Sequence, residues 1–536
     1  MKDQIIQVPD IPEDEVTPLV RLLLQIIQQQ ASSLIQAKEE IQKLKDEIAI
    51  LKKGNKKPKV PPSSLEKSYP DHNEDEKRFG IVKKSKTSEL KIHSVQRISP
   101  PNLPKGSIFK DLNSYVVQDL LIVNHNTKYL LERWQGPDGS YIVGKLPENI
   151  TGHFGSNLIC FILYQYYGSL VTRPRLLRQL HDFGIDISKG QLEDILNHKK
   201  EMFHSEKKDI LSVGIRTSPF IQTDDTQARH AGKNGYCTTI TNHAFTWFST
   251  TQSKSRINFL KLLHGKKLLY LINENAIDYV RQKGGVKAEL LANSLGTNYP
   301  ISFDNEKDWE EYLKNLNISK DLEIRVVNEG ALLSGLLAEG VPKDLGILSD
   351  DAGQFDILEH ALCWIHEERH LKAITPWNEQ NQKETELVLD RFWNLYQKLK
   401  AYQKEPEQSK RKYIEEEFNS LFKTETMSDV FNRALSLIYN KKKELLKVLD
   451  RPEIPIHNNG SEQEIREYVK RRKISRGTRS EAGKACRDTF TSLKKTCYKL
   501  GVSFWDYLKG RLGIENPVKY LPVLVEEKNT AFTRTF

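Results

Sequence analysis

Two short apolar segments that each end in a pair of acids constrain the fold of this chain most. Residues 218–226 (SPFIQTDDT) and 346–351 (GILSDD) have the composition and length of buried strands. The first reaches Asp224 and the second reaches Asp350. Because reactive groups gather beyond the carboxyl ends of strands in open α/β sheets, both carboxylates are expected to point into one crevice. A turn or capping role is the alternative for either aspartate taken alone.

The segments that follow each strand predict a mixed sheet with helices. Residues 236–242 (YCTTITN) and 244–250 (AFTWFST) alternate like two strands of a hairpin, and a helix is predicted from about Ser255. Three strands followed by a helix are how an RNase-H-like α/β core begins. Residues 359–374 (EHALCWIHEERHLKAI) have the spacing of an amphipathic helix.

A third acid, Glu462, stands at the start of another predicted helix. Ser461 and Glu464 have the spacing of a capping box, which places Glu462 in the first helical turn. Ile465 and Val469 are expected to pack inward on the same helix. A carboxylate at this position can complete a cluster with the two aspartates.

Such a cluster suits metal-dependent phosphodiester chemistry. Cleavage needs an activated oxygen nucleophile and a neutralised leaving oxygen, and two divalent ions about 4 Å apart can supply both. Mg²⁺, or Mn²⁺ in its place, binds hard oxygen ligands and keeps several waters, so a few carboxylates suffice.

The charge distribution favours a polyanionic partner. The formal net charge is +10, and residues 466–495 contain eleven Lys or Arg against three acids. This concentration beside Glu462 predicts contact with DNA phosphates, whereas a merely solvated face is the alternative. The predicted DNA-binding residues are Arg466, Lys470, Arg471, Arg472, Lys473, Arg476 and Arg479.

The N-terminal third predicts association and DNA binding. Residues 16–53 contain a heptad-like seam, which indicates a coiled coil joining copies of the chain or else one helix folded back on its own core. In residues 151–205, two helices around Gly184, the second capped by Ser188, suggest either a helix-turn-helix or a plain helical hairpin. Strands are expected at 114–123 and 128–133, with a hairpin turn at 137–139.

Several classes of protein are disfavoured. No apolar run approaches eighteen residues and the first residues do not resemble a signal peptide, so no membrane association and a cytoplasmic, nucleoid-associated location are expected. The five cysteines form no C-x-x-C pair, which argues against a zinc ribbon. His366 and His370 have a metal-binding spacing, but a structural or supporting role is favoured because no third soft ligand is near. Trp364 and Cys363 are expected in the core.

Three segments together resemble the insertion sequence 66 family of transposases. They are FIQTDDTQAR, ILSDDAGQF with HALCWIHEERH after it, and IPIHNNGSEQEIR leading to RRKISRGTRSEAG. In that family a D-E-T step, an acid-led D-G-Y-like step, a C-W-x-H helix and an N-N-x-x-E-R helix carry the active site. The resemblance implies that Asp224, Asp350 and Glu462 are the catalytic and metal-binding acids.

The chain departs from the family pattern in places. His457 stands where an aspartate is usual, and the cysteine-rich motif near the N-terminus is missing, so zinc is not expected. Asp225 is a rival of Asp224, and Asp351 is a rival of Asp350, which is favoured because it keeps the spacing to Phe355.

The sequence therefore predicts a multidomain α+β protein with an RNase-H-like α/β core, mostly helical insertions, an N-terminal coiled coil and a helix-turn-helix-like segment. The expected function is a DDE transposase with two Mg²⁺ or Mn²⁺ ions, which binds double-stranded DNA at its element's ends and at the target and acts as a homo-oligomer. An inactive DNA-binding regulator and an RNase-H-like nuclease are the alternatives.

The expected parts are 16–53 coiled coil, 54–105 basic linker, 106–150 small β unit, 151–205 helix-turn-helix-like segment, 217–265, 345–375 and 453–515 core, and 266–344 and 376–452 insertions.

Overall fold

The computed structural model describes residues 17–23, 25–27, 29–30, 92–147, 152–296 and 299–534. Contacts divide the chain into two units, one comprising residues 1–34 and 127–536 and the other residues 35–126. In the second unit, the described residues 92–126 contain neither helix nor strand. The expected heptad positions 34–51 and the linker up to residue 91 lie outside the described residues.

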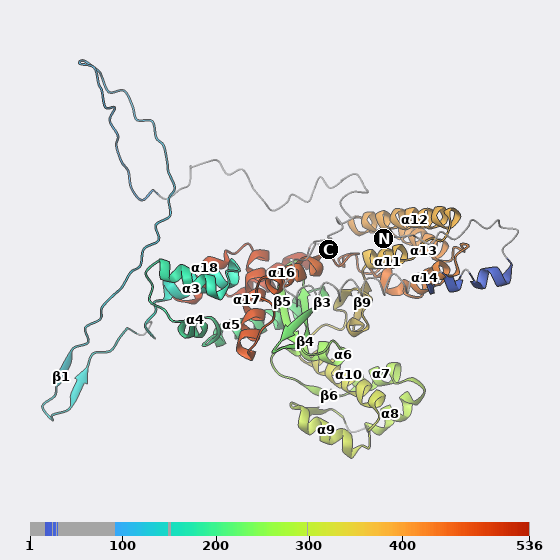
Figure 1. Cartoon of the computed structure of the whole chain (residues 1–536). Helices are drawn as coiled ribbons and strands as arrows, with labels where there is room; N and C mark the ends of the chain where they lie inside the picture. Colours follow the sequence, from blue (N-terminus) through green and yellow to red (C-terminus); the bar gives the residue numbers. More distant parts are fainter. Residues whose placement is uncertain are drawn as a thin grey trace. The chain divides into compact units, whose positions relative to one another are not determined.

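A five-stranded mixed sheet forms the centre of the larger unit. Its order is β5 (Thr246–Thr251), β4 (Lys233–Thr241), β3 (Phe220–His230), β8 (Gly346–Ser349), β9 (Glu359–Leu362). The first three strands are antiparallel, and β3, β8 and β9 are parallel. Counted along the chain, the spatial order of the five strands is 3-2-1-4-5. Figure 1 shows β3, β4 and β5 beside one another.

Helix α17 (Glu481–Lys499) covers the free edge of this sheet at β5. The backbone N–H groups of alternate β5 residues donate to α17 side chains one turn apart: Thr246 to Thr496 (3.1 Å), Phe248 to Ser492 (2.9 Å) and Thr250 to Asp488 (2.7 Å). An edge strand would otherwise leave these donors without partners, because alternate groups face away from β4. The polar side chains of α17 therefore replace a sixth strand.

The β3–β4 hairpin extends beyond the rest of the sheet. Strand β8 pairs only with residues 220–222 of β3, and β5 reaches only Tyr236 of β4. Residues 225–235 therefore form a two-stranded arm, closed by Ala231 and Gly232, both with positive φ (48° and 80°). Two consecutive positive φ values suit a tight hairpin turn.

Helix α16 (Asn459–Ser475) runs beside this arm (Figure 1). Tyr468 of α16 joins Ala228, Cys237 and Phe248 in a small buried cluster between helix and hairpin. At the far end, Thr478 donates to the backbone of Arg229 (2.9 Å), and Ala231 donates to Thr478 (2.8 Å). The loop after α16 is thus fastened to the tip of the hairpin.

Two largely helical regions interrupt the core. The first contains α7 (Glu274–Lys283), α8 (Ala288–Ser294), α9 (Glu306–Asn315), α10 (Asp321–Ala338) and the pair β6 (Tyr270–Ile272) and β7 (Ile301–Phe303). Its α10 packs on α6 (Arg256–His264) of the core. The second contains α12 (Glu379–Lys404), α13 (Gln408–Phe422) and α14 (Asp429–Asn440), with a hydrophobic cluster of its own around Trp364 and Phe392.

The segment expected to resemble a helix-turn-helix forms as two helices. They are α3 (Arg173–Asp182) and α4 (Lys189–Asn197), separated by a turn in which Gly184 has φ 73°. Ser188 and Gln191 form a capping box at the start of α4. The two helices are confirmed, and their role as a DNA reader stays a prediction.

Two sequence-based expectations are wrong. Residues 359–362, expected to begin a helix, form β9, and α11 (Trp364–Lys372) follows. The strand expected at 114–123 does not form, and of the strand expected at 128–133 only Arg133 is in a strand, as the first residue of β1. The hairpin around residues 137–139 does form, with β1 (Arg133–Gln135) and β2 (Tyr141–Val143), but every residue of both strands is exposed, so this hairpin has no core of its own.

Candidate active site

Asp224 and Asp350 occupy equivalent positions on two adjacent parallel strands. Gln222 of β3 pairs with Leu348 of β8, and each aspartate lies two residues further on. Asp350 directly follows β8, as expected, whereas Asp224 lies inside β3, which continues for six residues beyond it. The Asp224 carboxylate accepts a hydrogen bond from the Asp225 N–H (2.7 Å), and that of Asp350 accepts one from Ala352 (3.2 Å).

Glu462 lies in the first turn of α16, as expected. The expected capping box is wrong, because Asn458 is the N-cap residue and the Ser461 hydroxyl donates to the Asn458 carbonyl (3.1 Å). Glu464 is buried and pairs with Lys495 (3.0 Å) instead of reaching back to the helix start.

The start of α16 is held directly against β3. The fully buried Asn458 donates through Nδ2 to the Thr223 carbonyl (2.8 Å), next to Asp224. Gln222 donates in turn to the His457 carbonyl (3.1 Å). Gly460 permits this approach, since a Cβ there would lie 2.0 Å from the Gln222 side-chain oxygen. These contacts fix where Glu462 stands relative to Asp224.

The three acids influence one another electrostatically. Burial raises the pKa of Asp224 to about 7, and the negative charges of Asp350, Asp225 and Glu462 add to this rise. Within the described part of the chain, however, no three His, Cys, Asp or Glu side chains are already arranged to hold a metal ion. Glu462 instead pairs with Arg369 of α11 (3.1 Å) and lies 3.7 Å from His366 Nε2.

The two rival acids are occupied by other partners. Asp225 points to the opposite face of β3 from Asp224, where its carboxylate accepts hydrogen bonds from Thr238 and from Gln354 (3.0 Å). Asp351 is exposed and pairs with Lys441 (2.6 Å). Asp224 and Asp350 therefore keep the more available carboxylate oxygens.

Helix α11 carries His366 and His370, for which the sequence favours a structural or supporting role, and Arg369, to which it assigns none. His366 and Arg369 both face Glu462, whereas His370 turns to Glu367 (3.5 Å). Burial, followed by the nearby Arg369 charge, lowers the pKa of His366, so its ring is neutral near pH 7. Trp364 and Cys363 are fully buried, as expected. Only the one-turn spacing from His366 to Arg369 could have indicated a shared partner.

Some of the predicted phosphate-binding residues are exposed, whereas others already have partners within the protein. Arg471 is 4% exposed, and its guanidinium lies 4.0 Å from the centre of the Tyr166 ring. It packs inside the protein, so the expectation of a phosphate contact is wrong for this residue. Arg472 is half-buried and donates to the Gln227 carbonyl. The exposed members are Arg466, Lys470, Lys473, Arg476 and Arg479.

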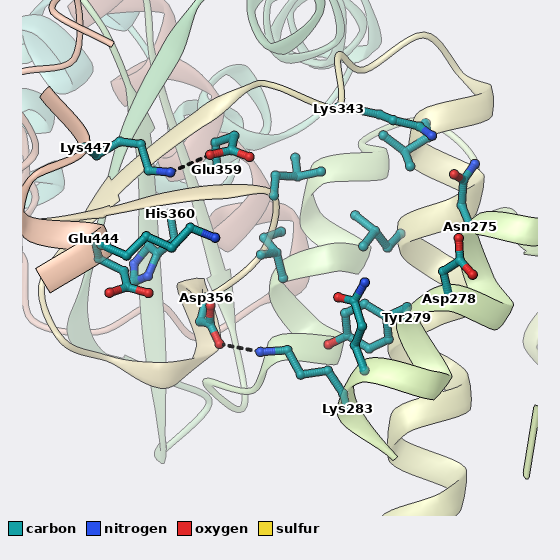
Figure 2. Close-up of a pocket in the computed structure, with 16 residues that line it drawn as sticks. Asn275, Asp278, Tyr279, Lys283, Lys343, Asp356, Glu359, His360, Glu444 and Lys447 are labelled. Carbon is teal, nitrogen blue, oxygen red and sulfur yellow. Dashed lines mark hydrogen bonds and ion pairs between the residues drawn. The ribbon is translucent and has the colours of Figure 1, made fainter. Parts of the chain in front are cut away.

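A cavity of about 490 Å³ lies elsewhere, between the first helical region and the start of β9 (Figure 2). Glu359 in its wall pairs with Gly346 at the beginning of β8, the end of that strand away from Asp350. Lys447 neutralises Glu359 (2.6 Å) and Lys283 neutralises Asp356 (2.9 Å), as Figure 2 shows. These two acids are therefore not free to bind a cation.

The comparisons with known proteins identify a family, and its matched residues span the candidate site. The sequence model of the family described as "Transposase IS66 family" matches residues 151–272 and 349–485, which include Asp224, Asp350 and Glu462. The unmatched residues between these ranges contain α7 to α10. An uncharacterized protein of Sinorhizobium fredii (strain NBRC 101917 / NGR234), y4jO, is 39% identical over 308 residues, which are 57% of this chain and 95% of that protein. Among the described residues, no helix is both long and apolar enough to cross a membrane. The chain belongs to the IS66 family of transposases.

Proposed function

We propose that this protein is a DDE transposase with an RNase-H-like core, which binds the ends of its mobile element and catalyses DNA cleavage and strand transfer. The strand order 3-2-1-4-5 supports such a core. The observation that carries the proposal is the equivalent placement of Asp224 in β3 and Asp350 directly after the adjacent parallel strand β8, with Glu462 in the first turn of the helix that Asn458 joins to β3.

The donor set fits two Mg²⁺ or Mn²⁺ ions, with Asp224, Asp350 and Glu462 as ligands. All three donors are hard carboxylate oxygens, and the raised pKa of Asp224 reflects buried negative charge that a cation would offset. When bound, the ions would activate the attacking oxygen and neutralise the leaving 3′ oxygen.

The remaining residues position these acids. Asn458 and Gln222 hold the start of α16 against β3, and Arg369 orients Glu462 through their ion pair. Glu462 must loosen its contact with Arg369, or share its two oxygens, to act as a ligand. The neutral His366 beside it adds no positive charge that would compete with a cation.

The experiment is cleavage of a duplex that carries the terminal sequences of the element, in Mg²⁺ and in Mn²⁺. Asp224→Asn and Asp350→Asn are expected to remove cleavage. Asp225→Asn and Asp351→Asn are matched neighbours that keep most of it, because their side chains serve Gln354 and Lys441. If only Asp225→Asn and Asp351→Asn lose cleavage, the catalytic acids are Asp225 and Asp351 instead of Asp224 and Asp350.

Two alternatives remain distinguishable by experiment. A DNA-binding regulator is favoured by the Glu462–Arg369 pair, because a cation of the chain itself already engages one of the three acids. It predicts binding of the ends without cleavage under any metal condition. A nuclease would cut but would not join pre-cut ends to target DNA in a strand-transfer assay.

A further inference from the structure

The exposed cations of α16 form a single stripe that starts at Glu462. Arg466, Lys470 and Lys473 follow Glu462 at intervals of four, four and three residues, so the four side chains share one face of the helix. The opposite face is buried and contains Ile465, Tyr468 and Arg471. The stripe therefore leads outward from the proposed catalytic acid along the surface of the protein.

The stripe continues onto the tip of the β3–β4 arm. The loop after α16 carries the exposed Arg476 and Arg479, and its Thr478 is bonded to the backbone of the arm. Gly477 allows this contact, since a Cβ there would lie 2.3 Å from the Arg229 carbonyl oxygen. The tip itself adds the exposed Arg229 and Lys233, which lie more than 230 residues earlier in the chain.

The acids along this surface are already engaged. Glu467 pairs with Lys494 (2.7 Å), and Glu481 pairs with Lys484 (2.6 Å) and with His230 (2.7 Å). Glu464 is buried and pairs with Lys495. The surface is therefore positive beyond Glu462, which suits a polyanion whose charges are regularly spaced.

We propose that this surface binds the DNA duplex on one side of the scissile phosphate, with Arg229 and Lys233 of the arm as its outermost contacts. The proposal rests on the proposed function, because it takes the carboxylate site as its origin. Arg476, at the end of α16, lies fourteen positions after Glu462, a length of about 21 Å along the helix. At about 3.4 Å per base pair, the tip reaches DNA roughly six base pairs from the cleaved bond.

The first test is the salt dependence of DNA binding by the full chain. The probe is a labelled duplex of arbitrary sequence, about three helical turns long. The double variant R229Q/K233Q is expected to bind about tenfold more weakly and to lower the slope of log K against log salt by roughly two, one for each lost phosphate contact. The matched control is K287Q/K314Q, which removes two exposed lysines from the first helical region.

An unchanged slope in R229Q/K233Q, or an equal change in the control, would overturn the proposal. The result is separable from the proposed function. If the wild type never cleaves DNA and the tip variant still loses slope, the surface stands and the enzyme assignment fails. If the wild type cleaves and the tip variant binds normally, only the surface fails.

The second test measures position. All five native cysteines are buried, so a single Lys233→Cys residue can be labelled selectively with an iron chelate that cuts nearby DNA. With the duplex that the wild type cleaves, cuts are expected about six base pairs from the cleaved bond and on one side only. Cuts at the cleaved bond itself, or on both sides equally, would contradict the proposed path.

Discussion

Asn458 shows how a single side chain can decide the geometry of a site to which it contributes no carboxylate. Its amide joins the helix that carries Glu462 to the strand that carries Asp224, and it is fully buried. The sequence placed Asn458 within a family-like motif but gave no reason for its amide. The partner, a backbone carbonyl 235 residues away, is visible only in the folded structure.

Asn458→Ala is therefore expected to reduce metal-dependent cleavage more than DNA binding. The substitution removes a buried hydrogen bond, which costs about 1–3 kcal/mol of stability, and frees the start of α16 to shift. The measurement is cleavage against Mg²⁺ concentration together with duplex affinity. Asn459→Ala, at the exposed neighbouring position, is the matched control and should behave as wild type. Equal losses in both variants would argue against a positioning role.

Arg471 is a single residue for which the pattern of charges in the sequence predicts the wrong surroundings. It lies in a run of Lys and Arg that predicts phosphate contact, yet it is buried against Tyr166. Ile465, Tyr468 and Arg471 recur every three residues and share the inward face of α16. The position of Arg471 around the helix could therefore have distinguished it from the exposed cations, whereas the number of Lys and Arg residues in the segment could not.

Among the elements, α17 replaces a strand at the edge of the sheet. The acid-ending segments predicted β3 and β8, and their alternation predicted β4 and β5, because those strands have strong local patterns. Strand β9 was missed because its four residues are too few to show a period, and pairing with β8 decides its conformation. The contacts of α17 were equally unpredictable, since they join residues about 240 to 250 apart.

Ser492→Ala is expected to destabilise the protein by about 1–3 kcal/mol, because the buried Phe248 N–H loses its acceptor. Thr491→Ala is the matched control on the same helix, since the Thr491 hydroxyl bonds only within α17, to Arg487. Urea unfolding of both variants measures the difference. If Thr491→Ala lowers the free energy of unfolding as much as Ser492→Ala does, the hydrogen bond between Phe248 and Ser492 does not stabilise the protein.

The contact between the β4–β5 turn and α19 (Leu521–Thr533) predicts a pH dependence. His243 stacks on Phe532 at 4.1 Å, and burial, assisted by the charges of Lys528 and Lys499, lowers its pKa to about 4. Because the unfolded chain takes up this proton near pH 6.5, stability is lost as the pH falls from about 6.5 to 4.

The variant His243→Phe keeps a ring against Phe532 but cannot titrate. Its melting temperature should fall by a few degrees less than that of the wild type over the same pH range. The comparison uses thermal melts at matched pH values. If the melting temperatures of the two proteins fall in parallel with pH, His243 does not contribute to the pH dependence of stability.

At the scale of the whole molecule, the first helical region is built into the core although the family match omits it. Its α10 packs on α6, and both belong to the same hydrophobic cluster as Ile221, Ile240 and Ile347 of the central sheet. The sequence predicted an insertion at 266–344 but could not show whether it has a separate core. A separate cluster is found instead in the second region, around Trp364 and Phe392.

Replacing residues 273–338 by a short linker is therefore expected to give an insoluble or unfolded chain. The deletion would expose the face of α6 that packs on α10, together with buried apolar residues of the cluster that the two helices share. Solubility and binding of a hydrophobic dye report the outcome. A soluble variant with the wild-type unfolding transition would show that the region is a detachable addition.

The homo-oligomer predicted from the heptad-like seam also belongs to this scale. Removing residues 1–53, which include the heptad-like seam, should convert an oligomer to a monomer while a single end is still bound. Light scattering measures whether the oligomer is lost. A capture assay with two DNA ends measures whether each protein particle binds one end or two. Unchanged mass on light scattering would place the oligomer interface elsewhere.

Fixing α16 to the hairpin at both ends has a consequence for how such a protein can change over generations. The helix begins against Gln222 and Thr223, and the loop that follows it is bonded to Arg229 and Ala231. An insertion in the helix alone would break one junction, and so would an insertion in the hairpin alone. Length changes in these two distant segments must therefore occur together, so relatives with a longer hairpin should also carry a longer helix.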